Sequence, residues 1–142
     1  MGLKGIDSSL LVYAMDPTTD EHTRARDAIV GLESWAVNPT VIHEAYHALV
    51  FKRKMAPGDA RSKLTTLIRD RRTRFLNITR TVSLYAMDLA AEFSMGGRDS
   101  LIVGCYLHNA LEAMYTHDGE LLRRGKVAFR GQQIAFTDPL AV

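Results

Sequence analysis

Cysteine is nearly absent from this sequence. Cys105 is the only one among 142 residues, so no disulfide can form within the chain. Such a scarcity is typical of proteins from a reducing compartment. The sequence also lacks a basic start followed by an apolar run, and it lacks a long uncharged apolar span. We therefore expect neither a signal peptide nor a membrane helix, and we expect a cytoplasmic protein.

A strong excess of one charge is missing as well. Lys and Arg number 18 against 16 Asp and Glu, and the resulting net charge of +2 permits an anionic partner without requiring one. We find no internal repeat, low-complexity tract or linker. Because this length suffices for a single hydrophobic core, we expect residues 1–142 to form one domain.

Short β-like runs alternate with longer helical patterns along the chain. The expected strands cover residues 4–6, 35–37, 75–78, 112–115 and 133–137. Helical patterns cover residues 8–14, 18–34, 40–54, 57–74 and 81–93, and Asp99 opens the most hydrophobic helix. Strands separated by helices pair in parallel. We therefore predict an α/β fold, a three-layer α/β/α sandwich with a central parallel sheet of about four to five strands.

Two local signals set the expected helix ends. Thr18 and Glu21 have the spacing of a capping box, which predicts the start of the second helix. Gly96 and Gly97 are expected to end the helix that covers residues 81–93.

Four acids occupy comparable places in this pattern. Asp7 follows the first strand, Glu44 lies in the helix after the second, Asp99 opens the buried helix, and Asp118 follows the fourth strand. Taken singly, each could be a helix cap or a solvated surface acid. Ligands of parallel α/β sheets bind beyond the carboxyl ends of the strands, however, so we expect the four acids to share one edge. Clustered carboxylates favour a hard cation, Mg²⁺ or Mn²⁺.

Four motifs carry a resemblance to a known family: IDSSLLVYA, NPTVIHEAYHAL, GGRDSLIVGCYLHNA and YTHDGEL. In this order and spacing, the chain resembles a PIN-domain ribonuclease of the VapC type, the toxin of type II toxin–antitoxin systems. The resemblance implies a PIN-like fold and a catalytic, metal-binding site made of Asp7, Glu44, Asp99 and Asp118. It also implies that Ser8, Ser9 and Thr116 orient these acids, although Ser9 stands where Asn is common.

The function implied by the resemblance is metal-dependent hydrolysis of RNA. An endoribonuclease using Mg²⁺ or Mn²⁺ would leave 5′-phosphate and 3′-hydroxyl ends. The implied partners are an RNA substrate, a cognate antitoxin and a second copy of the chain in a homodimer. A housekeeping RNA-processing nuclease of the same fold and a non-catalytic binding module remain open as alternatives.

A rival motif overlaps the second acid. His43-Glu44-Ala45-Tyr46-His47 matches H-E-x-x-H, in which two histidines one helical turn apart bind zinc in metalloproteases. The extended form of that motif, with a downstream Gly and a third His, is absent. A distant Glu92 could serve as the third ligand, although nothing in its sequence context favours that.

Basic residues suggest a path for RNA. Lys52 and Arg53 end the helix that carries Glu44, and Arg98 precedes Asp99. Such residues can contact phosphates, or they can simply complement the dipole of their own helix.

Overall fold

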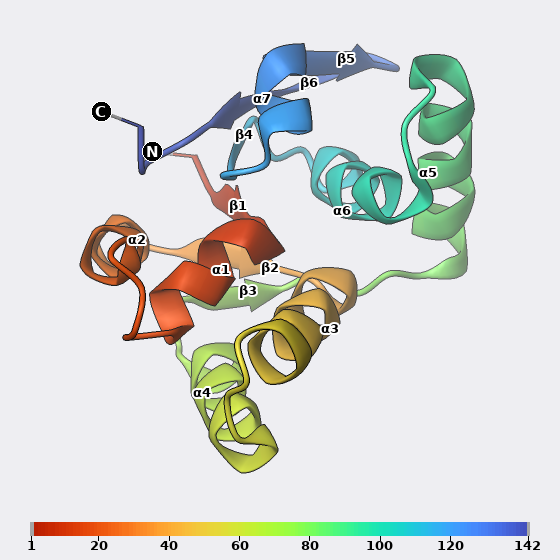
Figure 1. Ribbon diagram of the computed structural model, residues 1–142. Coiled ribbons are helices and arrows are strands. Elements are labelled where there is room, and N and C mark those ends of the chain that lie inside the picture. The colour runs from red at the N-terminus through yellow and green to blue at the C-terminus, as the bar shows by residue number, and fades with distance from the viewer. Residues whose placement is uncertain (1, 142) are drawn as a thin grey trace.

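A single sheet organises the chain. The computed structural model describes residues 2–141, and among these, six strands pair in the order β3-β2-β1-β4-β6-β5 (Figure 1). Their bounds are β1 (Lys4–Ile6), β2 (Trp35–Val37), β3 (Thr73–Phe75), β4 (Ala113–Tyr115), β5 (Lys126–Phe129) and β6 (Gln132–Thr137). All neighbours are parallel except β5 and β6. The predicted α/β class and parallel sheet are confirmed.

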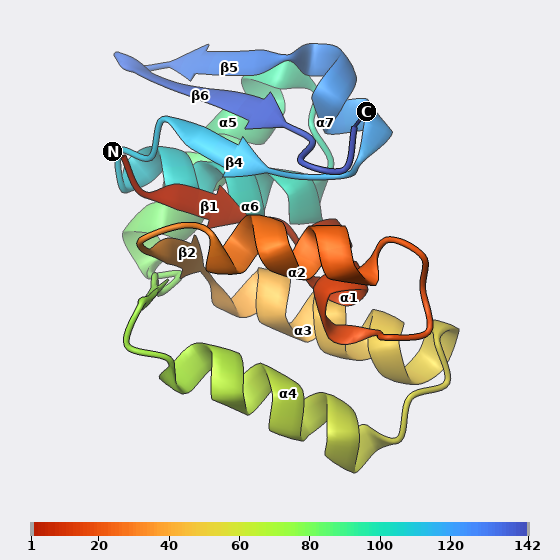
Figure 2. The same cartoon turned by 90° about the vertical axis from the view of Figure 1, so that its left-hand side faces the viewer.

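Helices cover both faces of this sheet. They are α1 (Ser8–Met15), α2 (His22–Val30), α3 (Pro39–His47), α4 (Pro57–Arg69), α5 (Arg80–Phe93), α6 (Gly97–His108) and α7 (Gly119–Arg124). A π-helical turn, η1 (Ala48–Lys52), continues α3 directly. Helices α1 and α2 lie on one face, and α5 and α6 lie on the other (Figures 1 and 2). The three layers follow from the alternation of short strands and amphipathic helices.

The register of the central strands aligns their carboxyl ends. Ile6 at the end of β1 pairs with Tyr115 at the end of β4, and Tyr115 pairs with Thr137 of β6. The Asp7 amide donates to the Tyr115 carbonyl at 3.0 Å, which extends the pairing by one residue. Residues that follow β1 and β4 are therefore neighbours in space.

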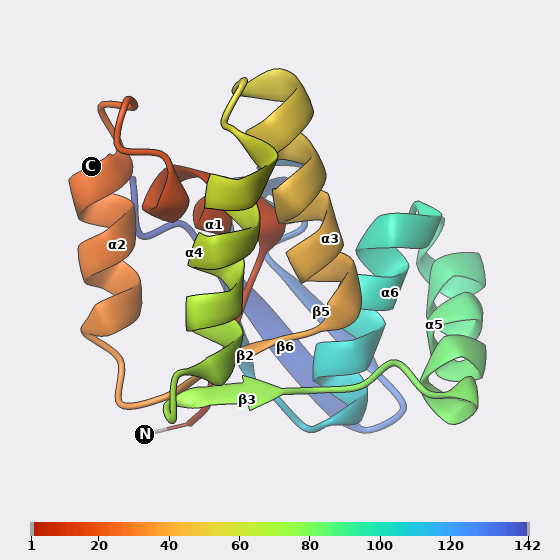
Figure 3. The same ribbon diagram turned by 90° about the horizontal axis from the view of Figure 1, so that it is seen from below.

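The core is centred on α6, which packs against both α5 and the sheet. Tyr106 is fully buried, and its hydroxyl donates to the carbonyls of Ile6 at 2.6 Å and Ala36 at 3.1 Å. Gly104 lets α5 approach closely, because a Cβ there would lie 2.9 Å from the Cβ of Ala86. Figure 3 shows α5 and α6 side by side, away from α1, α2 and α4. The prediction that this most apolar helix is buried is confirmed.

The antiparallel hairpin β5–β6 was not predicted. Arg130 and Gly131 connect its strands with φ of 51° and 82°, the left-handed conformation of a tight two-residue turn. Of the two hairpin strands, only β6 was expected, over residues 133–137. Strand β5 has four residues with alternating burial, and so short a pattern carries little periodic signal.

The predicted third strand lies too late in the chain. Residues 75–78 were expected, whereas β3 covers Thr73–Phe75. Its start is set by Trp35, which pairs with Thr73 and whose Nε1 donates to the Thr73 Oγ1 at 2.8 Å. Its end follows from β2, because the partner strand stops at Val37 and Asn38 caps the next helix.

Several predicted helix boundaries were also wrong. The helix expected over residues 18–34 covers His22–Val30, and the helix expected over residues 57–74 ends at Arg69. Thr18 does not cap α2: its amide and hydroxyl both bind the carboxylate of Asp16, at 3.0 and 2.7 Å, in a turn that precedes the helix. Helix α5 ends at Phe93, and Ser94 caps it with a φ of 51°, the left-handed conformation expected of a glycine. Gly97 instead begins α6. Among residues 2–141, no helix is long and apolar enough to cross a membrane.

Candidate active site

Asp7 lies where β1 becomes α1. It is the N-cap of α1, and its Oδ1 accepts from the Ser8 amide at 2.8 Å. Its Oδ2 accepts from the hydroxyls of Thr116 at 2.7 Å and Ser9 at 3.1 Å. Burial raises the pKa of Asp7 above its usual value, while these hydrogen bonds oppose that rise. The Asp7 carboxylate is therefore fixed in orientation and almost completely buried.

Thr116 joins the ends of β1 and β4. Its side chain is fully buried, donates to Asp7 and accepts from the Asp118 amide at 3.0 Å. Ser9 accepts from the His117 amide at 3.0 Å. One network of hydroxyls thus fixes Asp7 and the backbone that carries Asp118, which caps α7.

Glu44 approaches Asp7 from α3. That helix begins immediately after β2 because Asn38 caps it, accepting from the Val41 amide at 3.0 Å, and because Pro39 suits its first turn. The Glu44 Oε1 accepts from the Ser8 hydroxyl at 2.8 Å, and the Oε2 lies 3.1 Å from Nη1 of Arg98. Ser8 therefore touches two acids, through its amide and its hydroxyl.

Asp99 faces the other acids from the first turn of α6. Burial raises the pKa of its carboxyl to about 6, and the negative charges of Asp118, Asp7 and Glu44 add to the rise. Glu120 contributes as well. Sequence reasoning did not select Glu120, although its place in the first turn after Asp118 was a usable signal.

One cavity of about 770 Å³ brings these side chains together. It is lined by Asp7, Ser8, Ser9, Val12, Thr40, His43, Glu44, His47, Ala48, Lys52, Arg98, Asp99, Asp118 and Glu120. All four predicted acids and both serines line it. We call it the acidic cleft.

The acidic cleft has the donors of a hard-cation site but does not hold them in a coordinating arrangement. Among the described residues, no group of three or more His, Cys, Asp or Glu side chains could hold a metal ion as it stands. The hydroxyls of Ser9 and Thr116 bind the Asp7 carboxylate. Ser8 and Arg98 bind the Glu44 carboxylate. The carboxylate oxygens nevertheless suit Mg²⁺ or Mn²⁺. The pKa of Asp99 is raised first by burial and then by the neighbouring carboxylates, whose negative charges a bound cation would offset.

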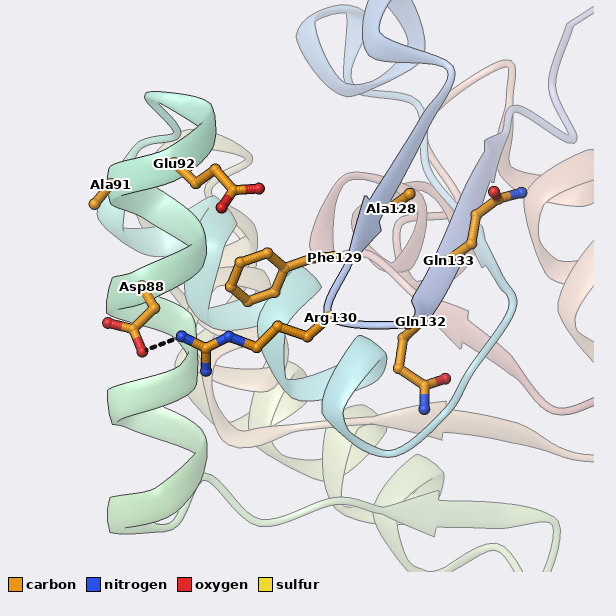
Figure 4. Close-up of a pocket in the computed structure, with 9 residues that line it drawn as sticks. Asp88, Ala91, Glu92, Ala128, Phe129, Arg130, Gln132 and Gln133 are labelled. Carbon is orange, nitrogen blue, oxygen red and sulfur yellow. Dashed lines mark hydrogen bonds and ion pairs between the residues drawn. The ribbon is translucent and has the colours of Figure 1, made fainter.

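The zinc-protease alternative gains no support from this geometry. His43 and His47 are exposed on α3, and His47 stacks on Phe51 with ring centroids 4.9 Å apart. Glu92, the suggested third ligand, lines a separate cavity between α5 and the β5–β6 hairpin (Figure 4). The same cavity is lined by Arg130, whose guanidinium binds Asp88 at 2.7 Å.

The three predicted RNA-contacting residues lie in different surroundings. Arg98 is 81% exposed at the cleft, where it pairs with Glu44. Lys52 lines the same cleft. Arg53 turns toward α1: its Nε lies 3.8 Å from the Asp16 carboxylate, and its guanidinium lies 5.3 Å from the ring centroid of Tyr13.

Replacement of Asp99 by asparagine is expected to stabilise the metal-free protein. The pKa of Asp99 is about 6 in the folded protein and 3.8 ordinarily, so the folded state binds its proton more tightly than the unfolded chain does. Protonated Asp99 therefore stabilises the fold fully below pH 3.8, and this stabilisation is lost as the pH rises through 6. The shift corresponds to roughly 3 kcal/mol, which solvent screening and the favourable helix dipole reduce to about 1 kcal/mol. Urea unfolding in EDTA should show this gain near pH 8 and a smaller one near pH 5. Asp20→Asn, at an exposed turn acid, should show no gain, and a less stable Asp99→Asn near pH 8 would contradict the prediction.

Comparison with known proteins identifies the family. The PIN domain sequence model matches residues 5–127. No curated protein matches this chain.

Solved structures show the same fold at low sequence identity. The toxin VapC20 of Mycobacterium tuberculosis, described as cleaving the sarcin-ricin loop, superposes with a TM-score of 0.72 at 14% identity, covering 91% of this chain and 98% of that one. DNA-bound VapBC of Salmonella typhimurium superposes with a TM-score of 0.70 at 15% identity, covering 98% of this chain and 99% of that one. VapBC2 of Rickettsia felis, bound to promoter DNA, superposes with a TM-score of 0.68 at 14% identity, covering 96% of this chain and 98% of that one. Because the family match spans most of the sequence, this chain belongs to the PIN domain family.

Proposed function

We propose that this chain is a metal-dependent endoribonuclease that hydrolyses RNA phosphodiester bonds and acts as the toxin of a VapBC-type pair. The convergence of Asp7, Glu44, Asp99 and Asp118 in one cleft carries the proposal. Membership of the PIN family and the fold shared with VapC toxins support it.

Asp7, Glu44 and Asp99 would hold Mg²⁺ or Mn²⁺ through their carboxylate oxygens, and Asp118 would bind a second ion or position the attacking water. When bound, the cation activates water and neutralises charge that develops on the phosphate and the leaving oxygen. Thr116 and Ser9 keep the Asp7 carboxylate oriented during turnover, since both hydroxyls donate to its Oδ2.

Arg98 has two roles in this proposal. Without a cation it compensates Glu44 at 3.1 Å. Its guanidinium is largely exposed, so it can leave Glu44 and bind an RNA phosphate instead, a group that suits its planar fork. Lys52, across the cleft, would supply a second phosphate contact.

Structures that share the fold support the proposed partners. One of them is a toxin–antitoxin complex from Klebsiella pneumoniae, and we propose a cognate antitoxin, a homodimeric toxin and a cytoplasmic location for this chain as well. A housekeeping RNA-processing nuclease with the same chemistry would not arrest growth when expressed alone. Relief of growth arrest by a coexpressed neighbouring gene product would favour the toxin.

Metal removal tests the chemistry directly. The purified chain, incubated with a mixed RNA pool and Mg²⁺ or Mn²⁺, should cut RNA and leave 5′-phosphate ends. Excess EDTA should lower the rate at least about 100-fold, because the activated water is lost with the cation. Added Mg²⁺ should restore it.

Two other outcomes would contradict the proposal. Binding of RNA without any cleavage would favour a non-catalytic module. Zinc-dependent digestion of unfolded casein would instead assign His43, Glu44 and His47 to a protease site.

A further inference from the structure

An exposed aromatic pair stands at the rim of the acidic cleft. Phe51 is 59% exposed, and His47 is also exposed. Their ring centroids are 4.9 Å apart and their planes are inclined by 36°. The two rings thus present a continuous aromatic surface to solvent.

The backbone holds this pair in place. His47 lies one turn after Glu44 and lines the acidic cleft with it. Phe51 belongs to η1, which prolongs α3 away from the sheet (Figure 3). Leu49 in the same turn is fully buried and anchors it. The π-helical widening of a helix end is frequent at functional sites.

Positive charge follows the aromatic pair in the chain. Lys52 comes directly after Phe51 and is exposed, whereas Arg53 turns toward Asp16 and Tyr13. Lys52 lines the cleft itself. A cation beside exposed aromatic rings is a combination that binds single-stranded nucleic acid, because a phosphate meets the cation while a base stacks on the rings.

We propose that His47 and Phe51 form a stacking platform for an unpaired base of the RNA substrate, on a strand whose phosphates pass Lys52 and enter the acidic cleft. The inference rests on the proposed nuclease function and adds to it a surface that binds one base of the substrate.

Binding of short RNA oligomers in EDTA tests the platform without any turnover. Oligoadenylate and an abasic ribose-phosphate oligomer of equal length carry the same charge, so only base stacking distinguishes them. The wild type should bind oligoadenylate roughly tenfold more tightly. Phe51→Leu should lose most of this preference, and Phe51→Trp should keep it. Met87→Ala changes a residue of similar exposure on α5 and should bind like the wild type.

The outcomes separate the platform from the nuclease. Equal binding of the two oligomers by the wild type, or an unchanged preference in Phe51→Leu, overturns the platform. Weaker binding of a protein partner by Phe51→Leu, with oligomer binding intact, also overturns it and assigns the rings to a protein interface. A base preference lost in Phe51→Leu, in a chain that cuts no RNA with any metal, supports the platform and refutes the nuclease.

Discussion

Asp7→Asn is expected to reduce metal-dependent RNA cleavage at least about 100-fold. Changes to residues that merely orient a metal ligand typically cost 10- to 100-fold, and Asp7 is proposed to contact the cation itself. An amide keeps the shape of the side chain, and its single oxygen can still accept from Thr116 and Ser9, although its NH2 group cannot accept from the Ser8 amide as the Asp7 Oδ1 does. The loss would therefore come from the missing charge and ligand oxygen. Initial rates of cleavage with saturating Mn²⁺ measure it.

A matched acid separates this effect from a general change of charge. Asp20 is exposed in the turn between α1 and α2, so Asp20→Asn should cleave RNA at the wild-type rate. Circular dichroism should show both variants folded. Full activity in Asp7→Asn would remove Asp7 from the reaction and, with it, the proposed site.

Gly5→Ala is expected to destabilise the fold by about 3 kcal/mol. A Cβ at this position would lie 2.5 Å from Cδ2 and 2.6 Å from Cε2 of Tyr106. The ring cannot retreat easily, because it is fully buried and its hydroxyl binds two strand carbonyls at 2.6 and 3.1 Å. Overpacking of this kind costs about 1–3 kcal/mol, and weakening the two hydrogen bonds adds about 1 kcal/mol each. The reduced entropy of the unfolded chain offsets less than about 1 kcal/mol.

Urea unfolding measures this loss, and Gly58 provides the control. A Cβ at Gly58, in the first turn of α4, would meet no atom within 4 Å among the described residues. Gly58→Ala should therefore stabilise the protein by about 0.5 kcal/mol through the unfolded state and helix propensity. A Gly5→Ala protein within about 0.5 kcal/mol of the wild type would show that Tyr106 can repack.

Residues that follow strands were the most predictable part of this molecule. Asp7 and Asp118 each follow a short apolar run, and parallel strands bring such positions to one edge. The long helical patterns were also reliable, because their periodicity extends over several turns. The shortest segments were not predicted reliably. Strand β3 was displaced because its pairing with β2, through Trp35 and Thr73, decides its limits, and β5 was missed because its pairing with β6 supplies most of its stability.

The contacts inside the acidic cleft lay beyond sequence reasoning. The ion pair of Arg98 with Glu44 joins α6 to α3. Glu120 adds charge from α7, and the stacking of Phe51 on His47 depends on how the chain turns after α3. Distances of a few ångströms between separate elements cannot be obtained from spacing along the chain.

Apart from β5, the sequence by itself determined the order of the strands and of the long helices, the kinds of side chain at their ends and the family to which they point, because these depend on local periodicity and motif. Only the tertiary structure decided which side chains meet. Parallel register places Thr116 against Asp7 across 109 residues, and burial at that junction raises the pKa of Asp7 and Asp99. Proximity and desolvation arise from packing, and packing exists only once the distant segments have come together.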